Sequence, residues 1–129
     1  MKFLLDTHIL IWSLENNPKL SDAFREVITD GKNMIFVSAV SAWEISIKKA
    51  MGKLNVPDNL TEEIKYKRFT PLNINFDHAK LAGELPHFHK DPFDRIIIAT
   101  AKCNNARIIT SDVIFGQYDV EIINSRSSA

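Results

Sequence analysis

The chain has almost no cysteine, no net charge and no long apolar stretch, and each absence excludes a class of protein. Its 129 residues include one cysteine, which excludes an internal disulfide and a zinc site built from several thiolates. We predict that this residue, Cys103, is a buried structural thiol late in an apolar helix. No apolar run approaches the length of about 20 residues that a membrane-spanning helix requires.

Sixteen basic and sixteen acidic residues leave a formal net charge of zero. Nucleic-acid-binding proteins usually carry a basic surface, so the overall charge gives no indication of such a partner. A nuclease is not excluded, because an enzyme needs only a local basic rim around an acidic centre. The first twelve residues contain Asp6 and His8 and lack a small-residue cleavage site, so they do not resemble a signal peptide. We therefore expect a soluble cytoplasmic protein with no membrane partner.

Apolar periodicity predicts short strands that alternate with helices along the whole chain. Strands are expected at residues 2–6, 34–37, 70–74, 107–111 and 120–123. Helices are expected at residues 7–16, 21–29, 41–51, 57–66, 77–85 and 92–104. This alternation is typical of a parallel sheet with helices on both faces. We predict a single α/β domain over residues 1–124, an α/β/α sandwich with a small, mainly parallel sheet, and a frayed tail at 125–129.

Four acidic residues stand at or near predicted junctions between strands and helices. They are Asp6, Glu44, Asp94 and Asp112. Because ligands usually bind where the carboxyl ends of parallel strands meet, we expect these acids to converge there. Converging carboxylates repel one another unless a cation neutralises them, and oxygen ligands suit Mg²⁺ and Mn²⁺. Such a metal activates water for attack at phosphorus, so the quartet predicts a phosphodiester-cleaving centre.

When each acid is taken alone, a structural role at the start of a helix is the favoured explanation. Asp6 and Asp112 can cap the helices that follow them, and Ser41 with Glu44 matches a capping box. The apolar residues around Glu44 and Asp94 favour the metal, because an isolated buried charge is expensive. The two explanations are compatible, since a cap holds an acid in one geometry.

Several other residues are candidates for supporting roles. Thr110 can hydrogen-bond an acid or a metal-bound water, or it is simply a β-branched strand residue. Three lysines follow Glu44 on the same predicted helix and can contact the phosphates of a nucleic acid or point into solvent. These lysines are Lys48, Lys49 and Lys53.

Arg95 and two histidines lie before or at the start of the predicted helix 92–104, and each has more than one possible role. Arg95 can contact a phosphate, although an i,i+4 ion pair with Asp91 is favoured. His87 and His89 lack the spacing of a zinc site and are expected on the surface of a loop. Three aromatic residues are expected in the core or in a dimer contact. They are Trp12, Trp43 and Phe93.

Four short motifs follow one another over nearly the whole chain. They are Leu4-Leu5-Asp6-Thr7-His8, Ser38-x-x-Ser41-Ala42-Trp43-Glu44-Ile45, Asp91-Pro92-Phe93-Asp94-Arg95 through Ala99, and Thr110-Ser111-Asp112. In this order they resemble the PIN-domain ribonucleases, and specifically the VapC toxins of bacterial toxin–antitoxin pairs.

This resemblance implies a Mg²⁺- or Mn²⁺-dependent endoribonuclease that cleaves RNA. It implies that Asp6, Glu44, Asp94 and Asp112 are the family's catalytic and metal-binding quartet, with Thr110 at the supporting hydroxyl position. It also implies a homodimer and inhibition by a cognate antitoxin protein. Two alternatives stay open: a PIN-like binding module without catalysis, and a PIN nuclease with an RNA-processing role outside any toxin–antitoxin pair.

Overall fold

In the computed structural model, which describes residues 1–54, 56 and 58–123, a parallel five-stranded sheet forms the centre of the molecule. The strands are β1 (Lys2–Leu5), β2 (Met34–Ser38), β3 (Thr70–Leu72), β4 (Arg107–Ile109) and β5 (Ile122–Ile123). Their order is β3-β2-β1-β4-β5, so β1 is the middle strand. Leu5 of β1 lies opposite Val37 of β2 and Ile109 of β4, and all four strand pairings are parallel. The predicted parallel sheet is confirmed.

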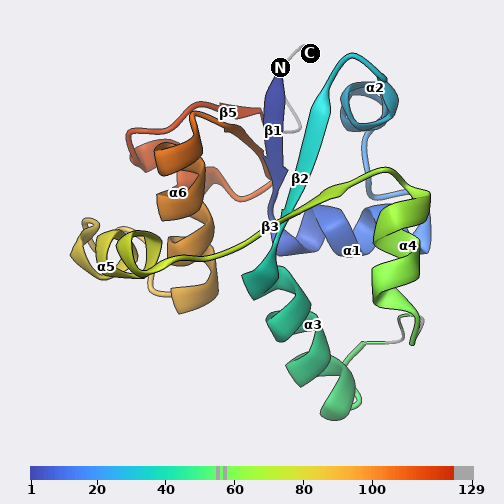
Figure 1. Ribbon diagram of the computed structural model, residues 1–129, viewed down its shortest axis with the longest axis horizontal. Helices are drawn as coiled ribbons and strands as arrows, with labels where there is room; N and C mark the ends of the chain where they lie inside the picture. The colour runs from blue at the N-terminus through green and yellow to red at the C-terminus, as the bar shows by residue number, and fades with distance from the viewer. Residues whose placement is uncertain (55, 57, 124–129) are drawn as a thin grey trace.

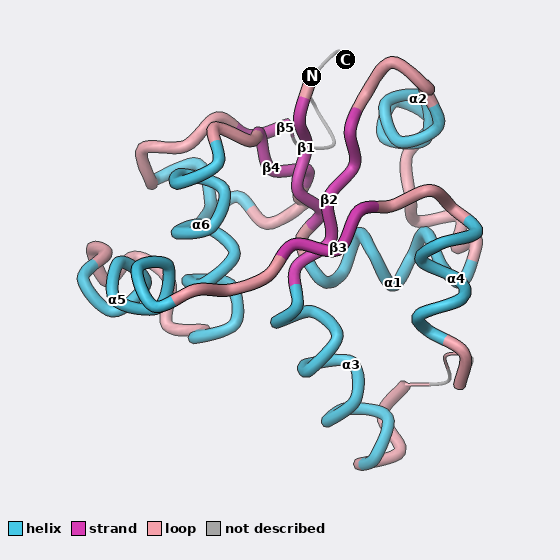
Figure 2. The backbone as a smooth tube through the Cα atoms, in the orientation of Figure 1, coloured by secondary structure: helices cyan, strands magenta, loops and turns pink. Residues whose placement is uncertain are grey.

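Helices cover both faces of this sheet (Figure 1). The described residues form α1 (Thr7–Glu15), α2 (Asp22–Thr29), α3 (Ala39–Ala50), α4 (Leu60–Tyr66), α5 (Phe76–Glu84), α6 (Pro92–Asn104) and the 3₁₀ helix η1 (Val113–Gln117). Figure 2 shows α1, α2 and α4 on one side of the strands and α5 and α6 on the other. Helix α3 extends from the end of β2. None of these helices is long and apolar enough to cross a membrane.

The alternation of side chains along β1 divides the core into two halves. Phe3 and Leu5 point to the face covered by α1, α2 and α4, where they pack with Ile9. Leu4 points to the opposite face, where it packs with Ile98 of α6. Successive strand residues face opposite sides, so a strand covered on both faces needs a continuous apolar run. The predicted α/β/α sandwich follows from this pattern.

Helices α1 and α6 each begin with an aspartate cap. The Asp6 carboxylate caps α1 by accepting the backbone N–H of Ile9 at 2.8 Å. Asp91 caps α6, whose first residue is Pro92. Proline suits this first position because its backbone has no N–H to leave unpaired.

The capping box predicted for Ser41 and Glu44 is wrong. Helix α3 begins at Ala39, and its cap is Ser38, whose hydroxyl accepts the Val40 N–H at 3.1 Å. The apolar strand β2 continues directly into this helix, so no break in the apolar pattern marks the boundary. Glu44 is therefore free of a capping role.

The predicted burial of Cys103 is also wrong, because this thiol is exposed. Helix α6 buries the face that carries Ile97, Ile98 and Ala101, and residue 103 lies outside that face. The predicted tail at 125–129 and the domain end at 124 lie outside the described residues, so both stay predictions.

The central position of β1 can be tested at Leu4, which is fully buried. We expect Leu4→Ala to lower the free energy of unfolding by about 2–5 kcal/mol, because it leaves a cavity between the sheet and α6. Urea unfolding followed by circular dichroism measures this change. Lys2→Ala, at an exposed position of the same strand, should change it by no more than about 0.5 kcal/mol. Equal effects of the two substitutions would contradict the assigned core.

Candidate metal centre

Asp6 follows the central strand and is held by three protein groups. Its backbone N–H donates to the Ile109 carbonyl at 3.1 Å, which extends the β1–β4 ladder by one residue. One carboxylate oxygen accepts the Ile9 N–H, and the other accepts the hydroxyl of Thr110. The same hydroxyl oxygen accepts the Asp112 N–H at 3.0 Å. A single threonine side chain therefore links the acids that follow β1 and β4.

Glu44 reaches the same region from α3 and is only 3% exposed. Its Oε2 atom accepts a hydrogen bond from the partly exposed Lys48 ammonium at 2.7 Å. Its Oε1 atom is buried without a hydrogen-bond partner among the residues that the structure describes. A buried acceptor without a partner is destabilising, so a cation bound at Oε1 would stabilise the site.

Asp94 and Asp112 come together through the side chain of His89. The imidazole Nε2 atom lies 3.0 Å from Oδ2 of Asp94 and 2.9 Å from Oδ2 of Asp112. The three candidate ligand atoms lie within 4.8 Å of one another. Asp94 occupies the first turn of α6, and Asp112 caps η1 through the Ile114 N–H at 2.9 Å.

The prediction that His89 is a surface residue is therefore wrong, whereas His87 is exposed as expected. The loop before α6 turns back because the Arg95 guanidinium donates to the carbonyls of Leu85, Pro86 and His89 at 2.8, 3.0 and 3.2 Å. The only local signal for His89 was its place just before a capping Asp-Pro pair. That spacing does not say which way the loop turns.

The same hydrogen bonds contradict both predicted roles of Arg95, the phosphate contact and the ion pair with Asp91. The ion pair with Asp91 is wrong, because the guanidinium is engaged by backbone carbonyls and the Asp91 carboxylate accepts the Phe93 N–H at 2.9 Å. Arg95 is 8% exposed, so it does not present a free cation to a phosphate. It is a structural residue of the loop.

The three lysines on and after α3 have different surroundings. Lys48 pairs with Glu44, and Lys49 pairs with the exposed Asp58. Lys53 is exposed just beyond the helix. Their contacts with RNA phosphates stay a prediction.

The aromatic residue beside Glu44 lies outside the core. Trp43 is 60% exposed and makes an edge contact with the Phe93 ring, with a centroid distance of 5.2 Å. The expectation of a core position is wrong for Trp43, whereas Trp12 packs against the core as expected. A dimer contact at Trp43 stays a prediction.

The electrostatics of the acids show that they form one group. Burial, together with the negative charges of Asp91, Asp6, Glu44 and Asp112, raises the pKa of Asp94 to about 8. Burial also raises the pKa of Asp6, against the effect of its hydrogen bonds. Each of these causes disfavours an additional negative charge at the site.

The residues present fit a divalent cation. Hard ions such as Mg²⁺ and Mn²⁺ prefer carboxylate oxygens, which the cluster supplies. A positive charge would relieve the repulsion that raises the Asp94 pKa, and it would satisfy the buried Oε1 atom of Glu44. The arrangement can therefore hold such an ion.

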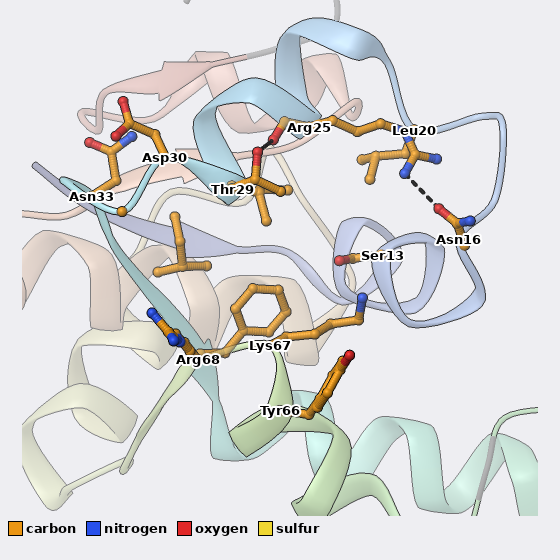
Figure 3. A pocket seen from close by; sticks show the side chains of 14 residues that line it. Ser13, Asn16, Leu20, Arg25, Thr29, Asp30, Asn33, Tyr66, Lys67 and Arg68 are labelled. Atoms are coloured by element: carbon orange, nitrogen blue, oxygen red, sulfur yellow. Dashed lines mark hydrogen bonds between the residues drawn. The ribbon is translucent and has the colours of Figure 1, made fainter.

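A separate cavity of about 520 Å³ lies between α1, α2 and the end of α4 (Figure 3). Tyr66, Lys67 and Arg68 line one side of it. On another side, Arg25 donates to the side-chain oxygen of Asn16 at 2.8 Å. The acid quartet does not contribute to the lining of this cavity. The cavity and the candidate metal centre are therefore different places on the molecule.

Comparison with known proteins gives the family of the chain. The model of the PIN domain family matches residues 3–121. The chain belongs to the PIN-domain family. It is also similar to Ribonuclease VapC16 of Mycobacterium tuberculosis, with 35% identity over 60 residues. That match covers 45% of this PIN domain chain and 43% of the relative, so it spans less than half of either protein.

Solved structures share the fold of this PIN domain. VapBC2 from Rickettsia felis, bound to a DNA fragment from its promoter, has a TM-score of 0.70 at 18% identity and covers 96% of this chain and 98% of that chain. FitAcB from Neisseria gonorrhoeae has a TM-score of 0.62 at 20% identity, with 95% and 96% covered. A toxin–antitoxin complex from Klebsiella pneumoniae has a TM-score of 0.65 at 22% identity, with 94% and 95% covered. VapC-type toxins are thus among the homologues of this PIN domain.

The raised pKa of Asp94 predicts a particular dependence of stability on pH. Its ordinary value is 3.8, so the folded PIN domain binds this proton more tightly than the unfolded chain does. Stability without metal should therefore fall as the pH rises from about 4 to about 8. Asp94→Asn carries no charge at any of these pH values. At pH 8 we expect the free energy of unfolding of this variant to exceed that of the parent protein by about 1 kcal/mol, which raises the Tm by roughly 4 °C.

Thermal unfolding in EDTA between pH 5 and pH 8.5 checks this expectation. The matched control is Asp77→Asn, which removes an exposed acid from the first turn of α5. The Tm of that variant should change with pH as the Tm of the parent protein does. If the Tm of Asp94→Asn also follows this pH dependence, Asp94 is not the group that causes it.

Proposed function

We propose that this chain is a Mg²⁺- or Mn²⁺-dependent endoribonuclease and the toxin of a toxin–antitoxin pair. The observation that carries the proposal is the meeting of four acids from separate elements. One of them has a buried oxygen that has no hydrogen-bond partner among the described residues, and another has its pKa raised to about 8. Membership of the PIN family supports a nuclease, since PIN nucleases use divalent metals.

Four residues would hold the ion in this proposal: Asp6, Glu44, Asp94 and Asp112. Asp6 and Asp94 are the proposed direct ligands, Glu44 is a third, and Asp112 acts through water or at a second ion. When bound, the cation supplies Lewis-acid chemistry, because it acidifies water and neutralises charge on the phosphate.

The protein's own groups prepare this site. Thr110 donates its hydroxyl to Asp6, which holds that carboxylate in one orientation. Burial of Asp6 and Glu44 keeps bulk water away from them and strengthens their interaction with a cation. Lys48 is partly exposed beside Glu44, where its ammonium can meet an approaching phosphate. Thr110 and Lys48 are thus proposed to orient the ligands and to attract the RNA backbone, respectively.

The partner in this proposal is an antitoxin protein. Support comes from solved homologues, because the Klebsiella pneumoniae structure is a toxin–antitoxin complex and shares the fold of this chain. The homodimer stays a prediction. A PIN-like module without catalysis is disfavoured, because all four acids are present and the charges of three of them act on Asp94.

Ribonuclease activity is tested with purified protein and both structured and single-stranded RNA. We expect cleavage in Mn²⁺ and none in EDTA. Asp6→Asn should lower the rate by about 100-fold or more, a transition-state effect of about 2.7 kcal/mol. Asparagine can still cap α1, so this variant should fold. Asp22→Asn, at an exposed acid in the first turn of α2, is the matched control and should cleave normally. Cleavage that persists in EDTA or in Asp6→Asn would refute the metal-dependent mechanism.

The toxin role is tested by expression in bacteria. Expression of the chain alone should arrest growth, and expression of Asp6→Asn should not. The chain should also co-purify from its natural source with a small protein encoded beside it. Growth without arrest and purification without such a protein would remove the toxin role and leave the nuclease.

A further inference from the structure

His89 is not an acid, and its imidazole lies within hydrogen-bond distance of the carboxylates of two members of the acid quartet. Its Nε2 atom lies 3.0 Å from Asp94 and 2.9 Å from Asp112. These two acids come from different segments, α6 and the start of η1. We propose that His89 is a positioning residue, whose Nε2–H holds Asp94 and Asp112 in the arrangement that binds the divalent cation. This inference rests on the proposed function.

The orientation of the imidazole is fixed by two contacts away from the acids. Its Nδ1 atom accepts the Asp91 N–H at 3.2 Å. Its ring meets the edge of the fully buried Phe115 ring, with a centroid distance of 5.6 Å and an interplanar angle of 86°. The side chain is 11% exposed, so it has little room to turn.

The bond at Nδ1 decides which role His89 can play. A ring nitrogen that accepts a hydrogen bond carries no proton, so in the neutral imidazole the proton lies on Nε2. The Nε2–H then donates to Asp112, lies 3.0 Å from Asp94, and is not a metal ligand. Asp112 keeps its other oxygen on the Ile114 N–H. His89 therefore orients the ligands and leaves coordination to the carboxylates, an arrangement that commonly tunes metal affinity.

Two side chains other than His89 also hold the backbone of the loop. Arg95 binds the carbonyls of Leu85, Pro86 and His89. The Tyr118 hydroxyl donates to the Pro86 carbonyl at 2.7 Å and accepts the His89 N–H at 2.8 Å. A substitution of the His89 side chain therefore tests the imidazole, and a substitution of Tyr118 tests the loop.

Two variants distinguish the roles of the two ring nitrogen atoms of His89. In His89→Asn, the side-chain oxygen can accept the Asp91 N–H in an Asx turn, but no donor reaches the acids. In His89→Gln, the longer side chain places an N–H donor near the position of Nε2. The controls are Tyr118→Phe and His87→Ala, the second of which removes an exposed histidine from the same loop.

The experiment measures Mn²⁺ binding to the full chain by the electron paramagnetic resonance signal of free Mn²⁺, with Tm recorded for every variant. We expect His89→Asn to bind Mn²⁺ about tenfold more weakly or worse, and His89→Gln to recover most of the affinity. Tyr118→Phe and His87→Ala should bind as the parent protein does. RNA is absent, so the readout does not depend on cleavage.

Three results would overturn the inference. Unchanged or tighter binding by His89→Asn would show that the imidazole does not position the acids. An equal loss in Tyr118→Phe would show that only the loop matters. If the parent protein binds Mn²⁺ and either result is found, the inference fails and the proposed function stands. If the parent protein itself binds no Mn²⁺, both fail.

Discussion

The repulsion among buried carboxylates at one edge of the sheet is the constraint on which the rest of the site depends. Asp6 and Glu44 are each only 3% exposed, and their charges act on Asp94. A low-dielectric environment amplifies both this repulsion and the attraction of any cation that enters. The same burial that makes the cluster unfavourable without a partner would therefore also strengthen its attraction for a cation.

The fold tolerates this repulsion by giving three of the four acids a hydrogen bond of their own. Asp6 and Asp112 accept backbone N–H groups at the starts of α1 and η1, and Glu44 accepts from Lys48. Charge-assisted bonds of this kind are stronger than neutral ones and fix the direction of the carboxylate. The start of a helix gives Asp6 and Asp112 a fixed orientation, so capping is compatible with the proposed binding of a metal.

The parts of the fold that follow from local pattern were predictable, and the parts that depend on distant contacts were not. The continuous apolar run in β1 and the acid directly after it place Asp6 at the sheet edge, and the same logic places Asp112 after β4. His89 could not be placed in this way, because its loop is directed by Arg95 and Tyr118. Helix α3 began earlier than expected because the sequence of β2 runs into it without a turn signal. The exposure of Trp43 depends on the angle at which α3 leaves the sheet, which no local pattern specifies.

The loop between α5 and α6 is held at both ends by side chains from other parts of the chain. Arg95 fixes the carbonyls of Leu85 and Pro86 at its beginning and that of His89 further along, and Tyr118 binds both Pro86 and His89. Most surface loops accept insertions and deletions because their ends are free to adjust. This loop has no such freedom, since one added residue would move the imidazole out of register with Asp94 and Asp112. Its length, rather than its composition, is therefore the property that related chains with the same site would have to keep.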